Sequence, residues 1–115
     1  MDIIPADATA NQEMTIRFND DVLRLTIIWN SIGSHWYMNV YDVETDLYIV
    51  EYLPLECGIP LGGRLGRSWV FLLADASGLD LDPVRVEDLG TRCILLIATV
   101  EEANALMALR TQGMS

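Results

Sequence analysis

Hydrophobic and polar residues alternate with a period of two along much of the first half of this chain. The clearest case is residues 23–42, LRLTIIWNSIGSHWYMNVYD, where two alternating runs flank a short Ser/Gly turn and each run carries a tryptophan. Because successive side chains of a strand point to opposite faces, the segment predicts a β-hairpin with one apolar face. The apolar positions of that face are Leu23, Leu25, Ile27, Trp29, Trp36, Met38 and Val40.

Further strands are predicted on both sides of this hairpin. Alternation at residues 13–18 indicates a strand that turns at residues 19–21, and residues 47–53 form a strand that ends at Pro54, because proline cannot donate to a ladder. Residues 68–74 are apolar, and residues 92–98 have the pattern of a strand buried on both faces. The side chains expected in the core are Trp29, Trp36, Trp69, Phe71, Ile94 and Leu96.

Two segments carry helical signals. Asp82, Pro83 and Gly90 occupy the N-cap, the first helical position and the position after the C-terminus of a short turn near residues 83–89. Thr99 and Glu102 have the spacing of a capping box, which predicts a C-terminal helix near residues 100–111. Positions that recur at helical spacing after this box are Ala103, Leu106, Met107 and Arg110.

These elements predict an all-β fold, a small sandwich or barrel of about six to seven mostly antiparallel strands. The 115 residues form one domain, with an extended N-terminal lead-in at 1–11, a β domain at 12–98, and a helix and tail at 99–115. Ile28, Ile49 and Leu53 lie on strand faces that the alternation assigns to solvent. A second sheet or another subunit that covers these faces would account for them.

The charge of the chain disfavours contact with nucleic acid. Seventeen acidic side chains stand against seven basic ones, so the formal net charge is −10. Binding to a phosphate backbone is dominated by cations, which are scarce here. All seven bases are arginine. The absence of lysine is consistent with drift in a GC-rich genome, or with arginines that hold contacts between subunits.

The two cysteines point to a reducing compartment. Cys57 and Cys93 are far apart in the sequence and lack the spacing of metal ligands. The sequence has no signal-peptide pattern and no apolar run long enough to span a membrane. We therefore expect a cytoplasmic protein without disulfides or a structural metal.

Candidate chemistry along the chain is weak. His35 is the only histidine, and Ser34 and Asp42 nearby lack the strand–turn–helix setting of a nucleophile elbow. A second cluster contains Asp75, Asp80 and Asp82, but its spacing matches no calcium loop, and turn or capping roles explain it. We therefore expect no catalytic, cofactor-binding or metal-binding residues.

Residues 55–67, LECGIPLGGRLGR, predict the longest irregular segment, with four glycines and two arginines. The part GGRLGR resembles a phosphate cradle but lacks the Lys-Ser/Thr end of a P-loop and precedes a strand. A flexible contact loop is the favoured interpretation, since arginines in so acidic a chain find carboxylate partners on neighbouring copies. The candidates for a subunit interface are Gly62, Gly63, Arg64 and Arg67.

The order of these features resembles the baseplate plug proteins of contractile-tailed bacteriophages. The resemblance covers about residues 12–98 and rests on WNSIGSHWYMNVYD, IPLGGRLG, DPVRVEDLG and RCILLI, taken in that order. It implies a virion structural protein on the central axis of the baseplate, where the tail tube meets the hub and spike. It also implies no enzyme activity and no cofactor, other baseplate, hub and tube proteins and further copies of itself as partners, and the host cytoplasm as its location before assembly.

An alternative remains from the residues alone. A small cytoplasmic module that binds a ligand or a protein could use a β-barrel whose interior is lined by aromatic side chains. The candidates for that lining are Trp29, Trp36, Tyr37 and Trp69.

Overall fold

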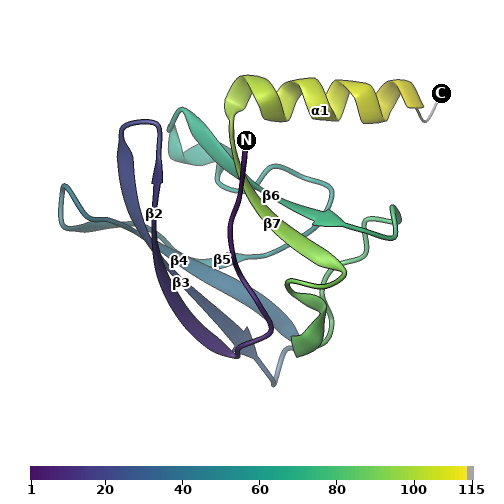
Figure 1. Cartoon of the computed structure of the whole chain (residues 1–115), viewed down its shortest axis with the longest axis horizontal. Helices are drawn as coiled ribbons and strands as arrows, with labels where there is room; N and C mark the ends of the chain where they lie inside the picture. Colours follow the sequence, from purple (N-terminus) through teal and green to yellow (C-terminus); the bar gives the residue numbers. More distant parts are fainter. Residues whose placement is uncertain (114–115) are drawn as a thin grey trace.

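Two antiparallel sheets and one C-terminal helix make up the protein (Figure 1). The computed structural model describes residues 1–113, without the side chains of Arg64 and of residues 110–113. The predicted Arg110 position on the helix therefore lies outside the described side chains. The all-β prediction with a short helical turn and a C-terminal helix is confirmed.

The first sheet consists of four consecutive strands joined as hairpins. Its order is β2 (Asn11–Phe18), β3 (Asp21–Asn30), β4 (His35–Asp42) and β5 (Leu47–Pro54). In the β3–β4 pair Trp29 lies opposite Trp36, and their ring centroids are 5.6 Å apart. The predicted tryptophan hairpin therefore forms with both rings in contact across the strands.

The second sheet joins the two ends of the chain. Its order is β1 (Asp2–Ile3), β7 (Cys93–Thr99) and β6 (Trp69–Asp75), with residue 2 opposite residue 97. The N-terminal lead-in is thus extended, as expected, but it is also fixed to the domain by β1 and by the buried Ile4. Helix α1 (Val100–Gly113) follows β7 directly, and Figure 1 shows it at the top of the view, above β6 and β7.

One core lies between the sheets. Trp36, Trp69 and Phe71 are fully buried in it, whereas Trp29 packs against it and is only partly buried. Ile94 and Leu96 are also only partly buried, because alternate residues of β7 face the core and these two face away from it. Leu96 packs instead beside the smaller cluster under α1, which contains Val70, Leu72, Ala98 and Ala103.

The short turn near residues 83–89 is shorter than predicted and begins later. Only Val86–Asp88, labelled η2, is helical, and Arg85 precedes it as the N-cap. Asp82 does not cap this turn, because its carboxylate accepts the backbone N–H of Cys57 at 2.7 Å. Gly90 does adopt the left-handed conformation expected of it, with φ of 85°.

The capping box at the start of α1 is present. The N–H of Thr99 donates to Glu102 Oε1 at 3.0 Å, and the N–H of Glu102 donates to Thr99 Oγ1 at 3.1 Å. Ala103 is buried against the outer face of β6 and β7, and Leu106 and Met107 are partly buried there. Across residues 1–113 no helix has the length and apolar character needed to cross a membrane.

Candidate functional site

The glycine-rich loop at residues 55–67 is anchored to the domain at two points. Leu55 and Leu61 are buried in the main core. Leu61 also exchanges two backbone hydrogen bonds with Phe71, at 2.7 Å and 2.9 Å. The middle of the loop is held against β6, so the loop is less flexible than the sequence predicted.

The tip of this loop is a single helical turn between two left-handed glycines. The turn, η1 (Gly63–Leu65), follows Gly62 with φ of 84° and precedes Gly66 with φ of 70°. A Cβ atom added at Gly63 would meet nothing within 4 Å. Gly62 and Gly66 are thus required by backbone conformation, whereas Gly63 leaves open space at the tip.

Arg67 at the end of the loop points back toward the domain. Its guanidinium lies 3.8 Å from the Asp42 carboxylate, which is almost buried at the β4–β5 turn. The side chain of Arg67 remains 37% exposed. Arg67 therefore has a long-range partner in its own chain and enough free surface to meet another, while the Arg64 side chain is outside the described part.

An apolar groove of about 460 Å³ separates the loop from β5. Because it opens at the surface beside Gly62 and Gly63, it joins the loop tip to an edge strand of the first sheet. The apolar side chains along it include Val50, Leu53, Ile59, Pro60, Leu61 and Leu65.

The other candidates from the sequence do not assemble into a reactive site. His35 and Asp42 are the first and last residues of β4, and an eight-residue strand separates them by roughly 20 Å. Among the residues that the structure describes, no group of His, Cys, Asp or Glu is arranged to hold a metal ion. Asp75 and Asp82 instead serve structural roles, as set out below.

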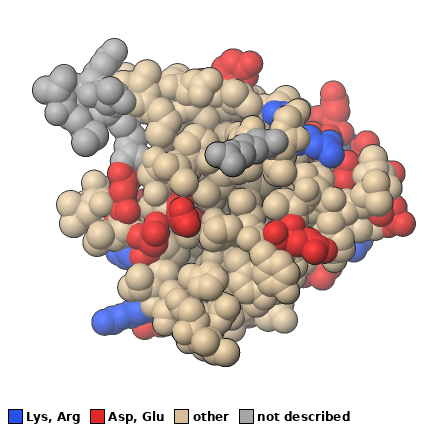
Figure 2. Space-filling model, turned by 180° about the vertical axis from the view of Figure 1, so that it is seen from behind, with Lys and Arg blue, Asp and Glu red and all other residues tan. Residues whose placement is uncertain are grey.

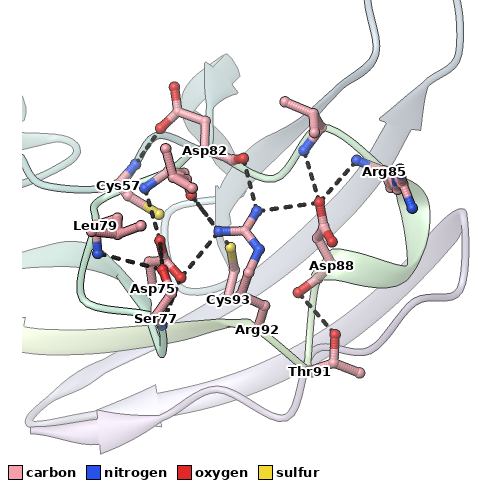
Figure 3. Close-up of polar contacts among 12 residues, drawn as sticks. Cys57, Asp75, Ser77, Leu79, Asp82, Arg85, Asp88, Thr91, Arg92 and Cys93 are labelled. Atoms are coloured by element: carbon pink, nitrogen blue, oxygen red, sulfur yellow. Dashed lines mark hydrogen bonds and ion pairs between the residues drawn. The ribbon is translucent and has the colours of Figure 1, made fainter.

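A polar network that the sequence did not predict centres on the partly buried Arg92 (Figure 3). Its guanidinium binds Asp75 at 3.0 Å and Asp88 at 3.2 Å, and it donates to the carbonyl oxygens of Leu81 and Asp82 at 2.8 Å and 2.9 Å. One side chain thus ties the start of β7 to the end of β6 and to the segment between them. The signal available in the sequence was a single arginine before an apolar strand, which does not identify its partners.

The carboxylates of this network are held in their charged form. Burial alone would raise the pKa of Asp75, but hydrogen bonds from Ser77, Leu81 and Arg92 outweigh it and lower the pKa. Asp88 behaves in the same way: burial opposes ionisation, and hydrogen bonds from Arg92 and from two backbone N–H groups lower its pKa. The network is therefore an ion pair that stabilises a long loop, not an acid and base poised for catalysis.

The fold also brings together the two cysteines, which are distant in sequence. Cys57 and Cys93 lie near each other beside the Arg92 network, and both cysteines are free (Figure 3). Burial raises the pKa of Cys57 to about 12 and also raises that of Cys93. Both thiols are therefore protonated at neutral pH and are poor nucleophiles.

The aromatic residues proposed for a ligand-binding interior do not line a common cavity. Trp36 and Trp69 are buried in core packing, and Trp69 contacts Phe71 with ring centroids 5.2 Å apart. Tyr37 follows Trp36 along β4 and therefore points to the opposite face of the sheet. The barrel with an aromatic interior is not what this sequence forms.

The surface is acidic and carries few cations. Figure 2 shows Asp and Glu side chains at several places on the face seen from behind, with Arg side chains at fewer. This distribution agrees with the net charge of −10.

Comparison with known proteins assigns the chain to a family. No curated protein matches it. The family model described as cyanophage baseplate Pam3 plug gp18 matches residues 1–101 of the 115. The match spans both sheets, the glycine-rich loop and the first residues of α1. The chain belongs to the cyanophage Pam3 gp18 family of baseplate plug proteins, components of the virion tail baseplate.

Proposed function

We propose that this protein is a structural subunit on the central axis of a phage baseplate, between the tail tube and the hub and spike. It acts there through contacts with other baseplate proteins and with copies of itself. Before assembly it is located in the host cytoplasm. The observation that carries this proposal is the match to the baseplate plug family over residues 1–101. The acidic surface agrees with an axial position, because a wall near the DNA path should repel phosphate.

The glycine-rich loop supplies one of the assembly contacts. Its tip leaves open space at Gly63, lies beside an apolar groove, and ends in the partly exposed Arg67. A neighbouring carboxylate that displaces water from such an arginine gains a charge-assisted, often bidentate hydrogen bond. Gly62, Gly63, Arg64 and Arg67 are therefore the proposed contact residues.

A double substitution, Arg64→Ala with Arg67→Ala, tests the loop. The melting temperature of the isolated protein should stay within about 2 °C of the parent, since the Arg67–Asp42 pair is long and partly exposed. Incorporation into purified tails, measured by quantitative immunoblotting, should fall at least about tenfold, the change expected from losing one good contact.

Arg85→Ala is the matched control, because it also removes a cation from an exposed position, and Arg85 belongs to the η2 turn and not to the tip of the loop. It should leave incorporation at the parental level. Normal incorporation of the double variant, or an equal loss with Arg85→Ala, would remove the loop from the proposed interface. Absence of the parent protein from purified tails would refute the baseplate role itself.

A further inference from the structure

Both cysteines of the chain are held against the same short stretch of backbone. Cys93, the first residue of β7, is fully buried, and the thiol lies 3.8 Å from the carbonyl oxygen of Leu81. Cys57 is partly buried against the same core, and its N–H donates to the carboxylate of Asp82, the next residue, at 2.7 Å. Figure 3 shows both cysteines beside Asp75. Residues 36 positions apart in sequence thus meet through two consecutive residues.

The two thiols differ in access to solvent and affect each other. Burial raises the pKa of both, and the thiol of Cys93 raises that of Cys57 further. Only Cys57 has exposed surface, since Cys93 is enclosed by the core. Within the described residues, no third His, Cys, Asp or Glu joins them in an arrangement that could hold a metal ion. The chemistry open to such a pair is oxidation of one thiol by the other's sulfur.

The backbone around Cys57 is free to adjust, whereas that of Cys93 is fixed. Cys93 is paired with Asp75 in the β6–β7 ladder. Cys57 lies in the irregular segment between the buried Leu55 and Leu61, and the next residue, Gly58, has φ of 88°. A disulfide requires Cβ atoms about 3.8 Å apart and a narrow range of dihedral angles. Movement of the Cys57 segment can satisfy this requirement without any change in the sheet.

We propose that Cys57 and Cys93 form a disulfide within one chain when the protein meets a peroxide outside a reducing cytoplasm. The exposed Cys57, as its thiolate, attacks one peroxide oxygen; the O–O bond breaks, one water leaves, and a sulfenic acid remains on Cys57. The sulfur of Cys93 then attacks that sulfur, which forms the S–S bond and releases a second water. The two thiols together give two electrons and two protons to the peroxide.

The bond would join the start of the glycine-rich loop to β7 after assembly. The raised pKa values keep the thiolate fraction small, so oxidation is slow and both thiols stay free while the chain is made. A reducing cytoplasm preserves that state, and a released particle has no such protection. The timing rests on the proposed assembly of the protein in the host cytoplasm.

Treatment of the purified full chain with hydrogen peroxide tests the proposal. Titration with Ellman's reagent in denaturant should show both free thiols lost, while a non-reducing gel shows a single chain. Trypsin should then release residues 25–64 joined to residues 93–110, and a reductant should separate the two peptides. Thiol loss should speed up about tenfold per pH unit from about pH 7 to about pH 9, because the thiolate is the reactive form.

The oxidised chain should melt at least about 5 °C higher than the reduced chain, because the bond closes a long loop. Cys57→Ser is the matched control: it changes a partly exposed residue, and it shows any effect of methionine oxidation under the same treatment. Its melting temperature should not rise, and its buried Cys93 thiol should remain free. Cys93→Ala should stop at the sulfenic acid of Cys57, which dimedone labels.

Two free thiols after treatment of the parent chain would overturn the proposal, as would a disulfide found only between chains or an equal rise in melting temperature for Cys57→Ser. In purified tails the same treatment should also remove both thiols, and tails that keep them would overturn the bond in the assembled particle. A negative result with the isolated chain leaves the baseplate role intact, because incorporation into tails measures that role separately.

Discussion

Trp69 donates its indole N–H to Asp21 Oδ2 at 2.7 Å, and this bond joins the first residue of β6 to the start of β3 in the other sheet. Trp36 is equally buried, but its indole nitrogen is the buried side-chain polar atom that lacks a hydrogen-bond partner among the described residues. The two tryptophans thus offer a comparison in which ring burial is matched and hydrogen bonding differs.

We predict that Trp69→Phe destabilises the protein by about 1–3 kcal/mol more than Trp36→Phe. The first change removes a hydrogen bond to a charged acceptor, whereas the second removes a donor that has no partner to lose. Urea denaturation of both variants measures the difference. Equal losses would mean that the Trp69–Asp21 bond contributes no net stability.

Replacing each tryptophan of the hairpin by alanine should cost different amounts of folding stability. We expect Trp36→Ala to cost about 3–5 kcal/mol, as for a large buried ring, and Trp29→Ala to cost clearly less because Trp29 is only partly buried. Chemical denaturation gives both values. A loss below about 1 kcal/mol for Trp36→Ala would contradict its place in the core.

Stability should fall in acid because of the carboxylates that bind Arg92. Asp75 and Asp88 have folded-state pKa values below their usual range, so they bind fewer protons folded than unfolded. Their stabilising contribution is therefore complete above about pH 5, and it is lost as the pH falls through about 4 toward the lowered values.

Thermal melts from pH 7 down to pH 2.5, an approximate window set by ordinary carboxylate pKa values, measure this loss. Arg92→Met should raise the pH at which the melting temperature begins to fall, because the buried Asp75 then loses its charged partner. Arg85→Met, a control with the same change of charge, should leave that pH unchanged. Identical curves for both variants would show that the Arg92 network does not set the acid sensitivity.

The loss of stability caused by three glycine substitutions should follow the local geometry of each glycine. Gly90 has φ of 85°, and an added Cβ would come within 2.7 Å of the carbonyl oxygen of Ala6. Gly78 has φ of 78° but open space around it, and Gly63 has open space without a left-handed backbone.

We therefore expect Gly63→Ala to be neutral or slightly stabilising, Gly78→Ala to cost about 1–2 kcal/mol, and Gly90→Ala to cost more than either. Differential scanning calorimetry of the three variants tests the order. A Gly90→Ala protein as stable as Gly78→Ala would mean that the N-terminal segment moves away from Gly90 at no cost.

The isolated protein should not bind duplex DNA at physiological salt. Its net charge of −10 leaves few cations for phosphate neutralisation. Fluorescence anisotropy with a labelled duplex measures this directly. Micromolar binding that weakens steeply as salt is raised would contradict it, and would also argue against a wall that repels DNA on the baseplate axis.

Local signals in the sequence predicted local structure well. The alternation around Trp29 and Trp36 gave the hairpin, and the spacing of Thr99 and Glu102 gave the capping box, because each depends on residues that are neighbours in the chain. The family resemblance followed from the same ordered patterns and is confirmed over a longer range, residues 1–101.

Contacts between distant segments could not be predicted in this way. Strand β1 has only two residues, too few to show alternation, and its partner lies at the other end of the domain. Arg92 gains its role from carboxylates and carbonyls that a loop folds around it.

The pairing of residue 2 with residue 97 means that the second sheet cannot be completed until almost the whole chain has been synthesised. Strands β2 to β5 are successive hairpins, so they can form while the chain is still leaving the ribosome. The second sheet must wait, because its central strand β7 is made almost last. Until β7 is made, β1 has no strand to pair with and β6 is held only by the two hydrogen bonds between Phe71 and Leu61, so a chain that stops before residue 93 cannot form the second sheet. A chain whose synthesis ends before β7 therefore exposes apolar side chains, which makes it a target for proteases and chaperones. Only a chain that contains β7 can complete the core.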